Sequence, residues 1–328
     1  MSRSKVLVTG GAGFIGSALV KRLVWEGNTV RVLDNVSRGH MRRLSEVENR
    51  IDVRIADIRD SKAVADAVRG MDVVIHLAAV NGTEFFYSKP ELVLDVGVRG
   101  MFAVLDACRL HGVGDLVVAS SSEVYQTPPV VPTDESAPLS VPDVMNSRYS
   151  YGGSKIISEL LTINYGRTGF HRVCLFRPHN VYGPDMGWEH VIPQFALRAK
   201  ALVEATPEGP IRFPLQGDGR QTRAFIHIQD FTEGLMSVIE RGTHLGLYHI
   251  GTQEEVTIGD VASMVVKWFG REANLVPSPA PVGGTPRRCP DIGRLQALGF
   301  SPKVGLKEGL ADTLSWYVQH THLQSVSS

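Results

Sequence analysis

The feature that most constrains this chain is a glycine-rich turn near its N-terminus. An apolar run, Val6-Leu7-Val8, ends at Thr9, and Gly10-Gly11-Ala12-Gly13-Phe14-Ile15-Gly16 follows at once. Apolar residues then recur at helical spacing, so a strand, a tight turn and a helix are predicted in that order. In such a unit the first glycine permits the turn, the second lets backbone approach a pyrophosphate, and the third lets the helix pack closely on the strand. The turn therefore predicts a dinucleotide site in which N–H groups at the start of the helix hold the phosphates.

A carboxylate at the end of the next predicted strand narrows the choice of dinucleotide. The run 29–33 reads as a second strand, and Asp34 follows it directly. A carboxylate there accepts hydrogen bonds from the adenosine ribose hydroxyls and repels a 2′-phosphate. Arg38 lies close enough in the sequence to weaken that preference. We expect NAD as the cofactor, in preference to NADP.

Composition excludes several classes of protein. The 328 residues suffice for a large core and a smaller lobe, and 34 Lys and Arg balance 34 Asp and Glu. No overall field therefore points to nucleic acid or to an anionic membrane. Cys108, Cys174 and Cys289 are far apart, in no metal-ligand or redox spacing, and are expected to be reduced. With no signal peptide or membrane-spanning segment in the sequence, we expect a cytoplasmic protein with no bound metal.

Predicted strands and helices alternate up to about residue 178, which is typical of a parallel sheet with helices on both faces. Beyond Arg177, prolines interrupt this alternation. The further strands are predicted at 51–56, 72–77, 116–119, 171–176, 224–228 and 247–250. The helices are predicted at 62–69 (capped by Ser61), 90–110, 147–165, 191–202, 229–240, 258–269 and 306–317.

This pattern predicts an α/β fold, a Rossmann-type doubly wound parallel sheet with a smaller C-terminal substrate-binding lobe. We assign residues 1–177 to the NAD-binding Rossmann domain and expect the strands near 224–250 to return to it. Residues 178–223 and 251–328 are assigned to the substrate-binding lobe.

A tyrosine and a lysine are spaced for one face of a predicted helix. In Tyr151-Gly152-Gly153-Ser154-Lys155 the phenol and the ammonium are one helical turn apart. A free tyrosine has a pKa of about 10, and a nearby cation favours its phenolate. The pair therefore suits proton removal from a hydroxyl, and Lys155 can also hydrogen-bond the nicotinamide ribose.

A cluster of hydroxyl groups follows the strand predicted at 116–119. The segment Ser120-Ser121-Ser122-Glu123 stands at the carboxyl end of that strand, where ligands bind in such sheets. Ser121 can hydrogen-bond the hydroxyl that Tyr151 deprotonates. The alternative interpretation is a hydroxyl-rich turn that only caps the following segment.

Taken together, these motifs resemble the extended short-chain dehydrogenase/reductase family, specifically its nucleotide-sugar epimerases, dehydratases and decarboxylases. Asp57-Ile58-Arg59 is similar to the family's adenine-contacting segment, and His76-Leu77-Ala78-Ala79 to its fourth-strand motif. The similarity covers nearly the whole chain, through segments 9–16, 34–35, 57–59, 76–79, 119–125, 151–155, 177–184, 217–223 and 287–292.

The resemblance implies NAD, a nucleoside-diphosphate sugar substrate and a homodimer formed by the helices at 90–110 and 147–165. The catalytic residues it implies are Ser121, Tyr151 and Lys155, with Glu123 as a candidate base. The cofactor contacts it implies are Gly10, Gly13, Phe14, Ile15, Gly16, Asp34, Asn35, Asp57, Ile58, Leu77, Ala78, Ala79, Tyr151, Lys155 and Pro178. The substrate contacts it implies are Ser122, Asn81, Thr83, Asn180, Arg223 and Arg287, the two arginines suiting a diphosphate.

Three positions depart from the family's pattern. Gly97 stands where the family usually has asparagine, and Gln126 where it usually has glycine. The segment 80–86 is an unfamiliar lining for a sugar pocket. These changes bear on the substrate and leave the cofactor and hydride steps intact.

The family's chemistry begins with Tyr151 removing a proton from a sugar hydroxyl, at C4, while that carbon passes a hydride to NAD. The 4-keto sugar can then be reduced from the other face, lose water after deprotonation at C5, or lose carbon dioxide. Ser122-Glu123 resembles the dehydratase and decarboxylase pattern, with Glu123 either a C5 base or a brace for the loop. We expect C4 epimerisation with NAD regenerated in place. The alternatives are a 4,6-dehydratase, a UDP-glucuronate-type decarboxylase, a simple alcohol dehydrogenase and a non-catalytic NAD-binding protein.

Overall fold

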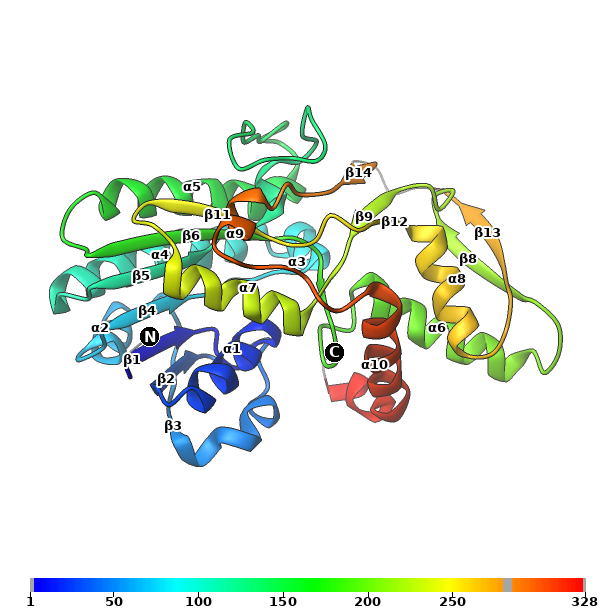
Figure 1. The fold of residues 1–328 in the computed structure, drawn as a ribbon, viewed down its shortest axis with the longest axis horizontal. Helices are drawn as coiled ribbons and strands as arrows, with labels where there is room; N and C mark the ends of the chain where they lie inside the picture. The colour runs from blue at the N-terminus through cyan, green and yellow to red at the C-terminus, as the bar shows by residue number, and fades with distance from the viewer. Residues whose placement is uncertain (1–2, 280–284, 327–328) are drawn as a thin grey trace.

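The computed structural model describes residues 3–279 and 285–326. Its main feature is a seven-stranded parallel sheet in the order β11-β6-β5-β4-β1-β2-β3 (Figure 1). The strands are β1 (Lys5–Thr9), β2 (Thr29–Asp34), β3 (Ile51–Ile55), β4 (Val73–His76), β5 (Asp115–Ala119), β6 (Arg172–Pro178) and β11 (Gly246–Ile250). The order reverses between β1 and β4, and such a reversal opens a crevice at the carboxyl ends of the strands. The predicted Rossmann-type α/β fold is therefore confirmed.

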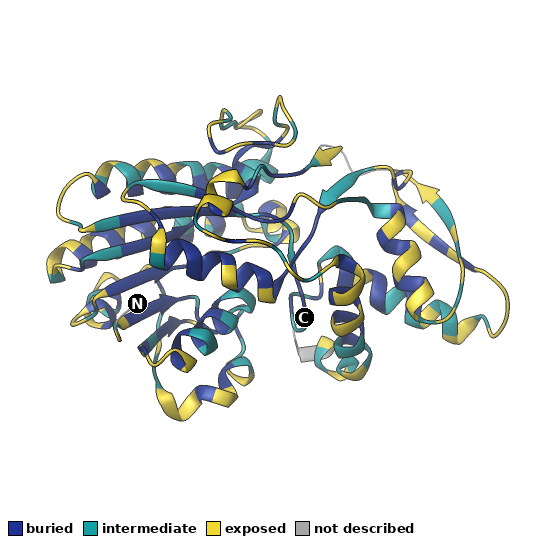
Figure 2. Cartoon of the chain, in the orientation of Figure 1, coloured by how far each residue is buried: buried dark blue, intermediate teal, exposed yellow. Residues whose placement is uncertain are grey.

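Helices cover both faces of this sheet. Because side chains alternate along a strand, Val6 and Val8 of β1 join the core on one face and Leu7 joins the core on the other. The first core includes residues of α1 and α7, and the second includes residues of α2 and α4. Buried residues dominate the sheet and the inner sides of these helices in Figure 2. The helices are α1 (Phe14–Trp25), α2 (Ser61–Val68), α4 (Pro90–His111), α5 (Ser150–Gly166) and α7 (Ile228–Arg241).

A second lobe, at the right of Figure 1, has its own core. It contains residues from three helices, α6 (Val191–Ala205), α8 (Ile258–Trp268) and α10 (Leu306–Gln319), and from the strand β8 (Ile211–Gln216), which pairs with β13 (Ala273–Ser278). Two small sheets, β12-β9-β14 and β10-β7, complete the strands. Their strands are β7 (Val181–Tyr182), β9 (Thr222–Ala224), β10 (Ile226–His227), β12 (Glu255–Thr257) and β14 (Arg287–Arg288).

Two local predictions are corrected by the structure. Asp60, and not Ser61, caps α2, because the Asp60 carboxylate accepts from the N–H groups of Lys62 and Ala63 at 3.0 Å each. The strand predicted at 224–228 is divided between β9 and β10, which lie in two different small sheets, and α7 starts at Ile228.

The C-terminal segment contributes residues to the cores of both lobes. Leu295, on α9 (Gly293–Ala297), and Phe300 pack into the core of the main sheet, although both lie in the range assigned to the substrate lobe. The β11 strand joins the main sheet, whereas β9 and β10 do not. The domain boundaries themselves stay a prediction.

Two further observations bear on the expectations from composition. Cys108, Cys174 and Cys289 are buried thiols and form no disulfide among the described residues. Within the described ranges, no helix combines the length and the apolar character needed to cross a bilayer.

Candidate active site

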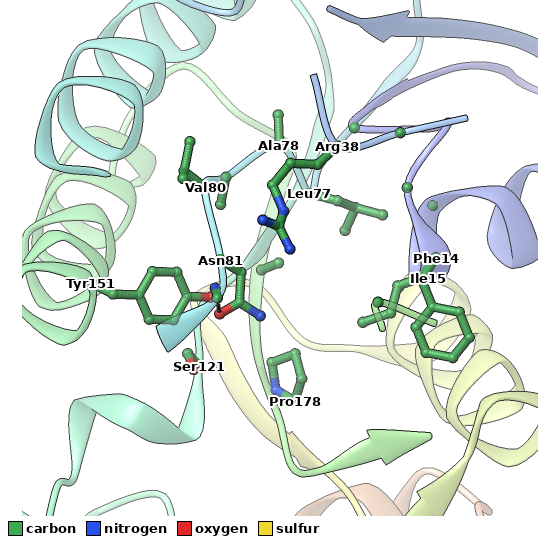
Figure 3. Close-up of a pocket in the computed structure, with 18 of the residues that line it drawn as sticks. Phe14, Ile15, Arg38, Leu77, Ala78, Val80, Asn81, Ser121, Tyr151 and Pro178 are labelled. Atoms are coloured by element: carbon green, nitrogen blue, oxygen red, sulfur yellow. Dashed lines mark hydrogen bonds between the residues drawn. The ribbon is translucent and has the colours of Figure 1, made fainter. Parts of the chain in front are cut away.

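A cavity of about 460 Å³ lies at the carboxyl ends of the central strands. Its lining includes all four predicted catalytic residues and every predicted cofactor contact. Figure 3 shows Tyr151 and Ser121 on one side of this space and Phe14 and Ile15 on the other. The structure therefore brings together residues that the sequence places more than a hundred positions apart.

The glycine turn fits a dinucleotide, and at Gly10 and Gly16 it leaves no room for a side chain. Gly10 has a φ of 71°. An added Cβ would lie 2.9 Å from the Ala78 nitrogen at Gly10 and 2.1 Å from the Gly10 oxygen at Gly16. The N-cap of α1 is Gly13, which forms no side-chain capping bond in the described structure, so N–H groups of the first turn remain available to a phosphate.

Asp34 is held beside this turn by backbone groups. Its Oδ2 accepts from the Ala12 N–H at 2.9 Å, and its Oδ1 accepts from the Val36 N–H at 2.8 Å. Because each carboxylate oxygen can accept two hydrogen bonds, both keep capacity for ribose hydroxyls. Nearby, hydrogen bonds from Arg59 and Asn35 hold the pKa of Asp57 well below its usual value, despite partial burial.

Tyr151 is buried at the other end of the cavity. Its ring stacks on Phe86, with ring centroids 4.9 Å apart. Phe86 belongs to α3 (Thr83–Ser88), a short helix that the sequence did not indicate. Burial raises the pKa of Tyr151 to about 12, although hydrogen bonding with Ser121 acts in the opposite direction. In the protein by itself, Tyr151 is therefore a protonated phenol at neutral pH.

Lys155 is positioned by the last residue of β5. Its Nζ donates to the Ala119 carbonyl at 2.8 Å and lies 5.7 Å from the centre of the Tyr151 ring. Burial lowers the pKa of Lys155 to about 8, and the negative charge of Glu159 opposes that shift. The ammonium is thus retained at neutral pH but is easier to deprotonate than an exposed lysine.

The neighbouring serines have different partners. The Ser120 hydroxyl donates to Glu159, which also accepts a two-pronged pair from Arg177 at 2.8 and 2.6 Å. These contacts tie α5 to the ends of β5 and β6. Ser121 accepts from the Glu123 N–H at 3.1 Å and so caps a short 3-10 helix, Ser122–Val124. Ser121 therefore combines the predicted capping role with a place beside the Tyr151 phenol.

Glu123 lies among three arginines. Its Oε1 accepts from Arg288 Nη1 at 2.6 Å, and its Oε2 lies 3.9 Å from Arg148 Nη2. Burial favours the neutral acid, but Arg288, Arg148 and Arg223 outweigh it and hold the pKa of Glu123 below its usual value. Burial and the charge of Arg288 lower the pKa of Arg223 to about 10. Glu123 is therefore an ionised carboxylate inside a positively charged cluster.

Of two adjacent arginines, Arg288 lies in the cavity lining, whereas the predicted substrate contact, Arg287, does not. Arg287 is an exposed residue that pairs with Glu255 at 2.8 Å, away from the cavity. Arg288 lines the cavity instead, because neighbouring residues of β14 point to opposite sides. Arg223 is partly buried near Glu123 but does not reach the cavity lining in the described structure. A strand of two residues is too short to show a periodic pattern in the sequence. The sequence therefore does not indicate that Arg288, and not Arg287, faces the cavity.

The other predicted substrate contacts, Ser122, Asn81, Thr83 and Asn180, all line the cavity. The structure adds several lining residues that the sequence analysis did not name as contacts: Arg38, Arg43, Phe86, Met186, Gly187, His190 and Arg288. The sequence did indicate Arg38 as a cation close to Asp34. His190 and Met186 lie in a segment that contains no recognised motif.

Two of the departures from the family's pattern, Gln126 and Gly97, have local explanations. Gln126 adopts a φ of 53°, a conformation that favours glycine, and its side-chain amide donates to the Glu123 carbonyl at 2.6 Å. At Gly97 an added Cβ would lie 2.8 Å from the Ser154 side chain, so the usual asparagine would collide with α5.

Comparisons with known proteins agree with this architecture. The chain is 32% identical to a dTDP-4-dehydro-6-deoxy-D-allose reductase of a Streptomyces species, over 96% of each chain. It is 30% identical to a UDP-N-acetyl-alpha-D-glucosaminuronate decarboxylase of Bacillus cytotoxicus, over 96% of this chain and 98% of the relative. A crystal structure of DesIV, a dTDP-glucose 4,6-dehydratase of Streptomyces venezuelae with NAD bound, matches with a TM-score of 0.86 at 30% identity, over 99% of this chain and 100% of that one.

The family model described as "NAD dependent epimerase/dehydratase family" matches residues 6–251. That range contains the glycine turn, Asp34, the serine cluster and the Tyr151/Lys155 pair. The predicted resemblance and the predicted cofactor are therefore confirmed, and this chain belongs to the NAD-dependent epimerase/dehydratase family of extended short-chain dehydrogenases/reductases.

Proposed function

We propose that this protein inverts C4 of a nucleoside-diphosphate sugar through a transient 4-keto intermediate. The observation that carries the proposal is the gathering of Ser121, Tyr151 and Lys155 in one cavity with the glycine turn and Asp34. The names of its relatives support a sugar nucleotide, since a reductase, a decarboxylase and a dehydratase all act on such compounds.

In this mechanism the Ser121 hydroxyl orients the C4 hydroxyl towards Tyr151. Bound NAD supplies a hydride acceptor and a positive charge beside the phenol. That charge and the nearby Lys155 ammonium favour the phenolate, which burial alone disfavours. Tyr151 takes the proton of the C4 hydroxyl group as C4 is oxidised, and it returns a proton to that oxygen once the keto group has been reduced from the opposite face.

The environment of Glu123 favours epimerisation over dehydration. Dehydration needs a base to remove the C5 proton, and a carboxylate with a lowered pKa is a weak base. The hydrogen bond that Glu123 accepts from Arg288 is one cause of this lowered pKa. We infer that Glu123 braces the arginine cluster. Epimerisation requires no second base, so the described side chains suffice for it.

The arginine cluster favours decarboxylation as a second candidate. Arg148, Arg223 and Arg288 surround a single carboxylate, Glu123, beside the reacting residues. Such an excess of positive charge suits an anionic group of the substrate, either the diphosphate or a C6 carboxylate. Only a C6 carboxylate would lead to loss of carbon dioxide.

Mass spectrometry of the products tests both candidates. The purified protein with NAD is incubated with UDP-, GDP-, CDP- and dTDP-linked hexoses and hexuronic acids, with Tyr151→Phe as the control. A product of unchanged mass with inverted C4, identified by NMR, supports epimerisation. Loss of carbon dioxide supports the second candidate, and loss of water contradicts the assignment of Glu123 as a brace.

We infer further that the protein forms a homodimer through α4 and α5. These helices pack against each other, and their outer sides expose Leu94 and Phe102 on α4 and Ile157 and Leu160 on α5. Burying such side chains between two copies would stabilise the pair. Light scattering at micromolar concentration tests the inference, and a monomer would contradict it.

A further inference from the structure

A group of ion pairs joins the segment between β2 and β3 to the loop between β7 and α6. We call it the clasp: Arg38, Arg42 and Arg43 on the first side, and Asp185 and Glu189 on the second. Arg42 Nη2 donates to Asp185 Oδ1 at 2.8 Å, and Arg43 Nη2 donates to the Asp185 carbonyl at 2.8 Å. Arg38 pairs with Glu189. The clasp therefore connects the two lobes of the molecule directly.

The basic side of the clasp faces the cofactor end of the cavity. Arg38 and Arg43 both line it, and Figure 3 shows Arg38 reaching into the space between Tyr151 and Phe14. The Arg38 guanidinium lies over the Phe85 ring, 4.7 Å from its centre. Arg43 Nη1 donates to the Ala12 carbonyl, within the glycine turn, at 3.3 Å. Arg43 is thus adjacent to the glycine turn that receives the phosphates, and Arg38 lines the same cavity.

The acidic side is fixed to the second lobe. The Tyr317 hydroxyl, on α10, donates to the Met186 carbonyl at 2.5 Å. The Gln194 amide, on α6, donates to the Trp188 carbonyl at 2.7 Å. Asp185 and Glu189 therefore move with the second lobe, and separation of the lobes would require the clasp to break.

The charges of the clasp do not cancel. Three arginines face two carboxylates, and the buried Arg43 Nε has no hydrogen-bond partner in the described part of the chain. A pyrophosphate carries negative charge, and the N–H groups of the glycine turn satisfy it from one side only. Arginine is suited to complete such a site, because its planar guanidinium binds phosphate oxygens in a fixed geometry.

We propose that Arg38 and Arg43 close over the pyrophosphate of NAD, and that Asp185 and Glu189 hold them there so that the cofactor stays bound between turnovers. Retention suits an enzyme that regenerates NAD in place, so the proposed benefit rests on the proposed function. The binding itself does not, because it concerns only NAD and this chain.

Release of labelled NAD tests the proposal. The protein is loaded with radiolabelled NAD, chased with excess unlabelled NAD and separated by gel filtration over time, with no sugar nucleotide present. Glu189→Gln and Arg38→Met each remove one member of the clasp at the rim. Gly187→Ala keeps every charge but places a Cβ 2.6 Å from Glu189 Oε2, which forces that carboxylate to move. Glu233→Gln is the matched control, because it removes an ion pair with Arg22 that joins α1 to α7.

We expect each of the three clasp variants to release NAD about tenfold faster than the wild type, as loss of a charged hydrogen bond would produce. Added salt should accelerate release from the wild type more than from Glu189→Gln, because salt screens the ion pair. The control should release NAD at the wild-type rate. Equal thermal stability of the NAD-free variants confirms that they fold.

Unchanged release rates in Glu189→Gln and Gly187→Ala, or equal acceleration in Glu233→Gln, would overturn the proposal. Rapid release from the wild type would do the same. The proposed function can fail without affecting this inference. A protein that retains NAD through the clasp but converts no sugar nucleotide would contradict the proposed function and would still support the clasp.

Discussion

The glycine turn at the cofactor end of the cavity is shaped by backbone atoms, whereas the surroundings of Tyr151 are shaped by charged side chains. At the first end, Gly10 and Gly16 leave no room for a Cβ, and backbone N–H groups hold Asp34. At the second end, Glu123, Arg148 and Arg288 come from three distant segments and are held by ion pairs. The backbone cradle is built by consecutive residues and tolerates no added atom. The group formed by Glu123, Arg148 and Arg288 depends on a balance of charges. We therefore expect that substitutions in this group can change it without disturbing cofactor binding at the glycine turn.

The largest effect is expected from a substitution of Tyr151, which alters one end of the cavity and leaves the glycine turn at the other end intact. Tyr151→Phe removes the proton acceptor and should lower kcat by about 10³-fold, within the range for general acid–base groups. The ring and its stacking on Phe86 remain, so NAD binding should be unchanged. Product formation and NAD content are measured on the same preparation. Full activity in this variant would remove the basis of the mechanism.

The second prediction compares two neighbouring arginines. Arg288→Met removes the hydrogen bond to Glu123 and a cation from the cavity lining, and should raise KM for the sugar nucleotide about 30-fold, or ~2 kcal/mol. Arg287→Met is the matched control, because Arg287 pairs with Glu255 at the surface, and its KM should not change. Steady-state kinetics of both variants decide the matter. A larger rise in KM for Arg287→Met than for Arg288→Met would instead support Arg287 as the substrate contact.

A third test applies to the backbone cradle. Gly16→Ala places a Cβ 2.1 Å from the Gly10 oxygen and should lower the free energy of unfolding by about 1–3 kcal/mol while weakening NAD binding. Gly153→Ala is its control on α5, since the nearest atom to that Cβ, on Val141, is 3.7 Å away. This second substitution should stabilise the protein by about 0.5–1 kcal/mol. Denaturant unfolding measures the stability of both variants, and titration with NAD measures their affinity for the cofactor. Equal stability and equal affinity in the two variants would show that the glycine turn has room for a Cβ at Gly16.

The final prediction concerns the pH dependence of stability that Lys155 produces, which develops gradually with pH. Burial lowers its pKa to about 8 from the usual 10.5, so the folded protein binds fewer protons than the unfolded chain between these values. The free energy of unfolding of the NAD-free protein should therefore rise with pH in that window, relative to Lys155→Met, by up to about 1.4 kcal/mol per pH unit. Activity should fall over the same window as the ammonium is lost. A parallel stability profile in the two proteins would contradict the assigned pKa.

Much of the cofactor end could be predicted from sequence because its determinants are contiguous. The glycine turn, Asp34 after its strand, and Tyr151 with Lys155 on one helix all depend on local geometry and on the periodicity of strands and helices. The order of these motifs along the chain also indicated the parallel sheet, whose topology the structure confirms.

Other features depend on which distant segments meet. The choice of Arg288 over Arg287, the restraint of Glu123 by arginines, the pairing of Arg38 with Glu189 and the stacking of Phe86 on Tyr151 all join residues far apart in the chain. The sequence by itself determined the fold class, the dinucleotide and the spacing of Tyr151 and Lys155 on one helix. Tertiary structure alone decided the charge around that pair and the ion pairs that join the two lobes, because ion pairs and burial are set by distances in space that local periodicity does not encode.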